Sequence, residues 1–276
     1  VIRHFLQDAA DGSLEGIPTL GVCTQPMENP GLRRKSGMGS RWTGVLVNRV
    51  PWGSPAQDLL EPGDVILSVS GEDVENDGTV EFREGERTQF GYLVQQRQVG
   101  DALGIEVLRK GEALEVDVPL TKRLNFERLV PFERFDVTPT YYIFGGLVFE
   151  PLTENYLMTW GDEPYEGAPS ELRDLFLNGM KSKDRREVVL LVKVLAHSVN
   201  VGYHDLKNRI VSTANGVEIS RMRDLMRAFE GHEGPYHEIV DEKGYRNVLD
   251  ARAVEDGREG LLETFGISSD RSLDLN

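Results

Sequence analysis

Apolar and polar residues alternate along much of the first half of the chain, as they do in β-strands. Val65, Leu67 and Val69 occupy every second position, which places them on one face of a predicted strand. Turn-forming residues bound this strand at Glu61–Asp64 and at Ser70–Asp73, where Pro presets φ and Gly accepts conformations that other residues avoid. The segment is therefore predicted to be the middle of a compact, strand-rich module.

Similar patterns extend over residues 17–120 and define a first module. Its predicted elements are strands at 19–25, 43–50 and 64–70, a helix at 88–98, and a hairpin at 103–120 that turns at Lys110-Gly111. The helix is inferred from Phe90, Leu93 and Val94, which recur at helical spacing.

The order of elements repeats in the second half of the chain. The predicted elements there are strands at 141–152, 187–195, 209–219, 236–242 and 246–252, and a helix at 220–230. Two turns match between the halves: Ser70–Val74 aligns with Asn215–Ile219, and Leu20–Val22 aligns with Gly145–Leu147. The chain is therefore predicted to contain two copies of one fold in tandem, mainly β with helices (α+β), each a partly open β-barrel or sandwich.

Two segments differ from the repeated pattern. Residues 123–139 are charged and interrupted by proline, which predicts a linker between domains at 15–122 and 140–276. The second copy also carries an insertion at 153–179, rich in Tyr156, Trp160 and Tyr165 and helical towards its end.

Bulk composition narrows the possible partners. The 276 residues are 39% hydrophobic and 28% charged, which is typical of a soluble globular protein, and no apolar run is long enough to span a membrane. A net charge of −15 disfavours nucleic acid and anionic membranes as partners. The single cysteine, Cys23, excludes an internal disulfide and a thiolate-based structural zinc site.

No catalytic constellation is found, so no catalytic residue, metal or cofactor is predicted. None of the five histidines stands in a recognisable triad order with a Gly-flanked serine. Residues 73–84 have the spacing of a calcium loop, but Glu75 at the third position and a preceding strand favour an acidic surface loop. His232 and His237 lack metal-ligand spacing and are predicted to be surface residues.

The order of these elements resembles a PDZ domain of the kind attached to HtrA/Deg serine proteases. Thr19-Leu20-Gly21-Val22 resembles that family's carboxylate-binding loop, and residues 144–147 resemble its counterpart. The runs TLGVCTQPMENPGLR, NDGTVEFR and YYIFGGLVFEPLT are similar to plant-type Deg proteases and their bacterial relatives. VIRHFL resembles the closing helix of their protease domain, so residues 1–14 are expected to be that helix and a linker, with the protease domain preceding Val1.

The resemblance implies a peptide-binding groove in each copy. A terminal carboxylate needs converging backbone amides, here those of Leu20 and Gly21, and the peptide then pairs with the strand edge at Val22 to Thr24. The expected site residues are Thr19, Leu20, Gly21, Val22, Cys23, Thr24, Phe90 and Val94 in the first copy, and Phe144, Gly145, Gly146, Leu147, Leu225 and Phe229, for peptide binding or assembly, in the second. Gly21→Val is expected to abolish binding without unfolding the protein.

Two functions are compatible with these residues. In the first, the tandem captures substrate peptides or protein C-termini and organises the oligomer of a Deg-type endopeptidase. In the second, it is an assembly collar whose grooves are filled by internal segments, such as the 153–179 insertion, or by other subunits of the same protein. The resemblance implies a periplasmic or other extracytoplasmic location if the protein is bacterial, and an organellar or nuclear one if it is plant-like.

Overall fold

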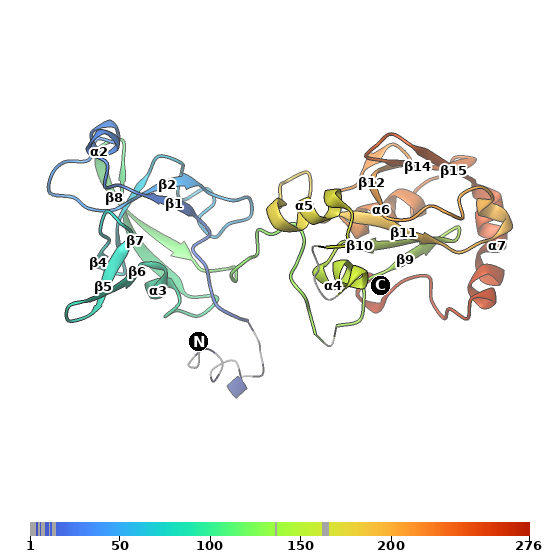
Figure 1. The fold of residues 1–276 in the computed structure, drawn as a ribbon, viewed down its shortest axis with the longest axis horizontal. Coiled ribbons are helices and arrows are strands. Elements are labelled where there is room, and N and C mark those ends of the chain that lie inside the picture. The colour runs from blue at the N-terminus through green and yellow to red at the C-terminus, as the bar shows by residue number, and fades with distance from the viewer. Residues whose placement is uncertain are drawn as a thin grey trace. The chain divides into compact units, whose positions relative to one another are not determined.

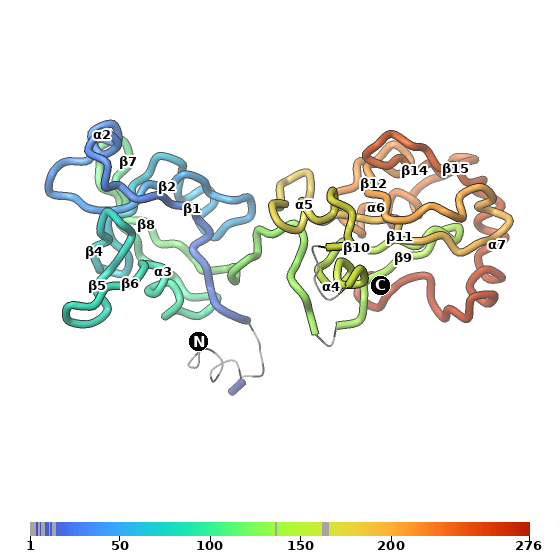
Figure 2. The backbone as a smooth tube through the Cα atoms, in the orientation of Figure 1, coloured from blue at the N-terminus to red at the C-terminus, as the bar shows by residue number. Residues whose placement is uncertain are grey.

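The chain forms two compact units, Val1–Glu127 (unit 1) and Arg128–Asn276 (unit 2) (Figures 1 and 2). The structure is a computed structural model, and it describes residues 4, 6, 9, 10, 12, 15–135, 137–161 and 166–276. Tyr165 and most of the predicted helix at 1–10 lie outside the described residues.

Unit 1 contains a six-stranded sheet and a separate two-stranded ribbon in its described part. The strand order of the sheet is β1-β2-β3-β7-β8, with β4 beside β3. The elements are β1 (Cys23–Pro26), α2 (Pro30–Lys35), β2 (Val45–Arg49), β3 (Val65–Val69), β4 (Glu72–Asp73), β5 (Thr79–Arg83), β6 (Glu86–Gln89), α3 (Gly91–Val94), β7 (Ala102–Arg109) and β8 (Glu112–Pro119).

The strongest sequence patterns in unit 1 give the expected elements. β3 is buried at all five positions in the middle of the sheet. The predicted hairpin is confirmed, because β7 and β8 pair along their whole length and turn at Lys110 and Gly111, both at positive φ. α3 is shorter than the predicted helix at 88–98. Residues 88 and 89 belong to β6, which pairs with β5 in a ribbon that was not predicted, and a turn follows Val94.

The turn before β3 is held by a buried ion pair. Asp64 is 1% exposed, and its carboxylate accepts hydrogen bonds from the Arg109 guanidinium at 2.8 and 2.7 Å and from the Glu61 amide at 2.9 Å. These contacts raise the pKa of Arg109. The aspartate of the Pro-Gly-Asp turn thus links the turn to the end of β7.

Unit 2 repeats this topology and adds a strand. In its described part the sheet has the order β15-β14-β12-β11-β10-β9, with β13 beside β12. The strands are β9 (Tyr142–Phe144), β10 (Leu147–Pro151), β11 (Val189–Val194), β12 (Arg209–Ala214), β13 (Val217–Glu218), β14 (Tyr236–Asp241) and β15 (Arg246–Asp250). The α-helices are α4 (Glu154–Leu157), α5 (Ser170–Asn178), α6 (Met222–Glu230) and α7 (Ala251–Thr264).

The two sheets correspond strand for strand once β9 is set aside. β1, β2, β3, β4, β7 and β8 of unit 1 match β10, β11, β12, β13, β14 and β15 of unit 2 in order and pairing. The predicted repeat and the mainly β, α+β fold class are therefore confirmed, and neither sheet closes into a barrel. Among the described residues, no helix has the length and apolar character needed to cross a membrane.

Part of the segment predicted as a linker packs inside unit 2. Leu129 and Val130 are buried in one apolar cluster with Leu172 and Phe176 of α5. Tyr156 and Trp160 of the predicted insertion pack against the same cluster, with their rings 5.2 Å apart. The insertion therefore contributes to a second apolar cluster of unit 2, beside its main core.

Candidate functional site

One edge of the unit 1 sheet is free of a strand partner. β1 pairs with β2 in antiparallel register, Thr24 opposite Val47 and Pro26 opposite Val45, and with no other strand in the described part of the chain. The register shifts between Cys23 and Thr24, so the strand carries a bulge where it leaves the preceding loop. This edge is available for strand addition.

The loop before β1 is shaped by a glycine that cannot be replaced without strain. Gly21 is buried at φ +69°, and a Cβ there would lie 2.5 Å from Ser54 Oγ and 2.9 Å from Pro55 Cδ. The Ser54 hydroxyl donates to the Gly21 carbonyl and accepts from the Ala56 amide at 3.0 Å. Through these two hydrogen bonds, Ser54 joins the loop to the segment that contains Ala56. Ser54 was not among the predicted site residues, although a Ser-Pro pair after a glycine favours a turn.

The donors that the loop offers differ from those expected. The Gly21 amide donates to Thr19 Oγ1 at 3.1 Å. The amides of Leu20 and Val22, by contrast, donate to no described residue. The Thr19 hydroxyl accepts from Gly21 and keeps its own proton for a further acceptor. The donors left for a ligand at this loop are therefore the amides of Leu20 and Val22 and the Thr19 hydroxyl. The prediction had named the amides of Leu20 and Gly21.

The expected apolar residues of the first site gather in one cluster. Leu20 and Val94 are buried there, and Val22 and Phe90 are half-buried against it. Val94 is 4% exposed, which makes it a core residue. Leu20 is equally buried, so Val22 and Phe90 supply the accessible apolar surface of this cluster.

The second predicted loop is a closed turn. Gly145 and Gly146, at φ +56° and +83°, form a two-residue connection between β9 and β10, with Phe144 opposite Leu147. Asn200 is fully buried and donates to the carbonyls of Gly145 at 2.9 Å and Leu195 at 2.8 Å. The sequence analysis treated 141–152 as one strand and did not single out Asn200.

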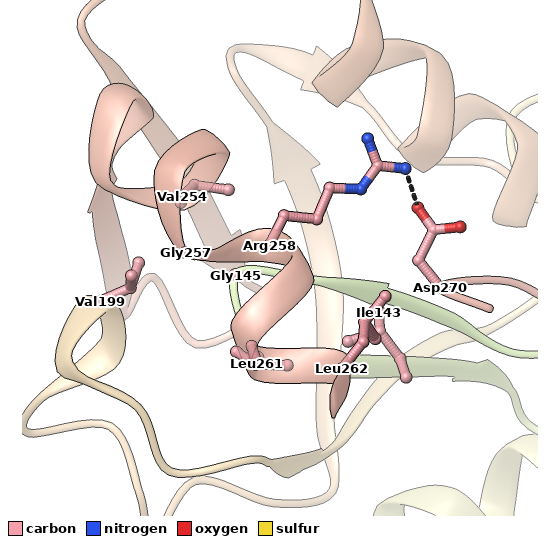
Figure 3. A pocket seen from close by; sticks show the side chains of 10 residues that line it. Ile143, Gly145, Val199, Val254, Gly257, Arg258, Leu261, Leu262 and Asp270 are labelled. Atoms are coloured by element: carbon pink, nitrogen blue, oxygen red, sulfur yellow. Dashed lines mark hydrogen bonds and ion pairs between the residues drawn. The ribbon is translucent and has the colours of Figure 1, made fainter. Parts of the chain in front are cut away.

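Helix α7 covers this turn. A Cβ on Gly145 would lie 2.5 Å from Leu249 and 3.2 Å from Val254. Beside the turn is a small, mainly apolar pocket of about 270 Å³ that includes open solvent, with the ion pair of Arg258 and Asp270 at 2.6 Å on its rim (Figure 3). The glycines of the second loop are thus packed against the helix.

Strand β9 occupies the edge of β10, the strand that corresponds to β1. Phe144 of β9 stacks on Phe229 of α6, with ring centroids 4.1 Å apart and an angle of 9°. Leu225 is fully buried in the same core. His237 was predicted to lie on the surface, but it is 6% exposed because β14 places it on the core face. Its ring is nearly perpendicular to that of Phe144, with the ring centroids 4.7 Å apart. An internal segment, rather than the 153–179 insertion, fills this groove.

Described residues also contact the two outer strands of the unit 2 sheet, β9 and β15. The C-terminal segment runs along β9, where the Ile143 amide donates to Asp270 O at 2.7 Å and the Ser272 amide donates to Tyr141 O at 3.0 Å. At the opposite edge, the Tyr203 hydroxyl accepts from the Val248 amide of β15 at 3.0 Å and donates to its carbonyl at 3.3 Å. Within the described residues, the β9 edge is thus bordered by a chain segment, whereas the β15 edge is bonded to Tyr203 at Val248.

The acidic segment with calcium-loop spacing forms a turn and a ribbon. The Asp77 carboxylate accepts from the Thr79 amide at 2.9 Å and from its hydroxyl at 2.8 Å, and these bonds lower the pKa of Asp77. Across the described ranges, no three His, Cys, Asp or Glu side chains gather in a way that would hold a metal ion.

Comparisons with known proteins agree with the repeated topology. Two segments, residues 18–120 and 130–274, match the PDZ domain family. The chain is 35% identical over its whole length to chloroplastic protease Do-like 2 of Arabidopsis thaliana, covering 44% of that protein. It is 32% identical over 83% of its length to mitochondrial protease Do-like 4 of the same plant, covering 41%. The chain spans less than half the length of these relatives.

Solved structures with weaker likeness include an HtrA-type protease, AlgW, with a decapeptide. It has a TM-score of 0.30 and 24% identity, over 42% of this chain and 33% of that one. The HtrA3 PDZ domain bound to a phage-derived ligand has a TM-score of 0.27 and 22% identity, over 37% of this chain and 83% of that one. With the two matched segments, the duplicated sheet topology and similarity to Do-like proteases along the whole sequence, the chain belongs to the PDZ domain family and carries two PDZ domains in tandem.

Proposed function

We propose that this tandem binds extended peptides through unit 1, by addition of the peptide as a strand to the edge of β1. The peptide's terminal carboxylate then lies at the loop Thr19–Val22, where the amides of Leu20 and Val22 and the Thr19 hydroxyl donate to it. Its last side chain rests against Val22 and Phe90, the half-buried members of the apolar cluster.

A single observation carries this proposal: β1 has no second strand neighbour among the described residues, whereas its counterpart β10 is paired with β9. The opposite edge of unit 1, β8, is longer than β1 but less suited to a peptide, because it carries the three carboxylates of Glu112, Glu115 and Asp117. β1 reads Cys-Thr-Gln-Pro and carries no charge. An uncharged edge beside free amides is the better acceptor for a peptide strand.

The test is fluorescence anisotropy with short peptides, each prepared as free acid and as C-terminal amide. We expect micromolar affinity for the free acid, because ordering of the peptide offsets much of the gain. Amidation removes hydrogen bonds to a charged acceptor and should weaken binding by about tenfold or more. Equal binding of both forms would instead indicate recognition of internal extended segments.

Alkylation of the single cysteine can show whether the peptide binds along β1. Cys23 lies in β1, is half-buried and carries the one thiol of the chain. A bound peptide should slow alkylation of Cys23, and prior alkylation with a bulky reagent should abolish binding. Normal binding to the alkylated protein would place the peptide elsewhere.

A second candidate function, an assembly collar, is favoured for unit 2 because β9 covers the edge of β10. β9 and the C-terminal segment occupy the edge of unit 2 that corresponds to the open β1 edge of unit 1. In this role unit 2 sets the spacing of subunits. The mass of the assembly in solution tests it: a monomer at micromolar concentration would argue against a collar.

We infer that the parent protein is a serine endopeptidase in an organelle, with hydrolysis carried out by residues outside this chain. The similarity to chloroplastic and mitochondrial Do-like proteases supports this inference. Protease assays of the parent protein, with and without the peptide that unit 1 binds, test it directly.

A further inference from the structure

Arg49 extends across the open edge strand of unit 1. It is the last residue of β2, its side chain is exposed, and it lies opposite Cys23 of β1. Its Nη2 atom is 3.4 Å from Cys23 Sγ, so the guanidinium reaches from β2 to the edge strand β1. A thiol is a weak acceptor, and no described carboxylate forms an ion pair with Arg49.

A peptide added to β1 would come within reach of this guanidinium. Adjacent strands lie roughly 4.8 Å apart, and residues directly opposite one another point to the same face of a sheet. The peptide residue opposite Cys23 therefore points to the face that carries Arg49. An Asp or Glu side chain at this position spans the remaining distance and meets the guanidinium above Cys23.

The face on which Arg49 lies is the face of the groove. Val45 and Val47 of β2 precede Arg49 at every second position, and both are buried in the cluster that contains Leu20 and Val94. Arg49 continues this row beyond the apolar cluster. It therefore borders the pocket for the last side chain, close to where the peptide also ends in a carboxylate.

We propose that Arg49 is a specificity-determining residue of the peptide site that forms an ion pair with a carboxylate of the bound peptide, above Cys23. The proposal rests on peptide binding to β1. The carboxylate belongs either to an acidic side chain near the peptide's C-terminus or to the C-terminus itself. In both cases the planar guanidinium can donate two parallel hydrogen bonds to it.

The experiment is a binding cycle between the protein and matched peptides. All peptides end in valine. They form pairs that differ by Glu or Gln at one of the positions before the valine, and each peptide is made as free acid and as C-terminal amide. Each is titrated against the full chain and against Arg49→Gln. Lys110→Gln is the matched control, because it removes the same charge at the β7–β8 turn, on the far side of the sheet from β1.

For an acidic side chain, we expect Glu at one position to improve the dissociation constant roughly threefold over Gln in the wild type and in Lys110→Gln, and not in Arg49→Gln. For the terminal carboxylate, Arg49→Gln instead reduces the free-acid advantage for every peptide, whatever its side chains. Either effect should shrink at raised salt, because the pair is exposed.

Identical Glu-to-Gln and acid-to-amide ratios in the wild type and Arg49→Gln would overturn the role of Arg49 while leaving peptide binding intact. Absence of binding by the wild type to any peptide would overturn peptide binding itself, and the proposed role of Arg49 with it.

Discussion

At the scale of single residues, Gly21 determines how the first loop can be tested. Its positive φ alone makes alanine cost about 1 kcal/mol, and the approach of Ser54 and Pro55 to a Cβ adds about 1–3 kcal/mol. Gly21→Val is therefore expected to destabilise unit 1 as well as to block the loop. The sequence suggested a clean binding mutant because the neighbours of the loop cannot be seen in it.

We predict that Gly21→Ala lowers the free energy of unfolding by about 2–4 kcal/mol in urea titrations. Gly71→Ala is the control, since Gly71 has φ +83° but nothing within 4 Å of its would-be Cβ. It should cost only about 1 kcal/mol. Equal losses in the two variants would mean that Ser54 and Pro55 can move aside.

His237 makes the stability of unit 2 depend on pH. Asn215 Oδ1 accepts from the Glu238 amide, so its Nδ2 donates both to Ala228 O at 2.8 Å and to His237 Nδ1 at 3.1 Å. The imidazole is therefore neutral, with its proton on Nε2. Burial, and then the nearby His232, lower the pKa of His237 below its usual 6.5.

We predict that unit 2 loses stability as the pH falls below about 6.5, by up to about 1.4 kcal/mol per pH unit. The unfolded histidine takes up a proton near this pH, while the folded one resists until its own lower pKa, so acid favours unfolding. Urea titrations at about pH 7.5 and 5.5 measure the loss. His237→Gln, whose side-chain carbonyl still accepts from Asn215, should flatten the dependence, and an unchanged slope would assign it to other groups.

At the scale of elements, the sequence predicted those whose own residues determine them. β3 and the β7–β8 hairpin follow from alternation and from Lys110-Gly111. β9 and β10 were read as one strand, because the apolar run at 141–152 continues through the two glycines on both sides. α7 was not predicted: Gly257 and Gly260 weaken its helical propensity, and packing of Val254 and Leu261 compensates.

The eight expected site residues of unit 1 illustrate the same limit. The motif located the loop and the edge strand, which are local features of the chain. The positions of Ser54 behind the loop and of Arg49 across β1 depend on pairing between distant strands. In unit 2, the covering of the predicted loop by α7 and Asn200 depends on tertiary packing that no local pattern encodes.

Because the C-terminal segment protects the edge of β9, its removal should expose that strand. We predict that a chain ending at Ser268 shows at least about tenfold faster hydrogen exchange at the Ile143 amide, which loses its bond to Asp270 O. A chain ending at Leu275 keeps this bond and the buried Leu275 side chain, and should match the wild type. Mass spectrometry of peptides spanning β9 measures both, and unchanged protection would mean that the segment does not cover the edge in solution.

At the scale of the whole molecule, the same sheet topology occurs in both units, but in the described part of the chain the corresponding edge is open in unit 1 and paired in unit 2. In unit 1 the edge strand β1 lacks a second strand neighbour in the described residues, and in unit 2 the chain itself supplies β9 there. Duplication keeps the sheet order because the core depends on it, whereas an edge can be closed by a few added residues. A groove and a closed scaffold can thus come from one topology.

We predict that residues 15–127 alone bind peptides with a dissociation constant within about threefold of the full chain, because every residue of the proposed groove, from Thr19 to Val94, lies in unit 1. Residues 128–276 should fold but bind none of the same peptides, since β9 occupies the edge of β10. Circular dichroism establishes that each fragment is folded, and anisotropy compares their affinities. Tight binding by residues 128–276 would show that β9 yields its place to an outside strand, and loss of binding by a folded 15–127 fragment would show that the groove needs residues beyond unit 1.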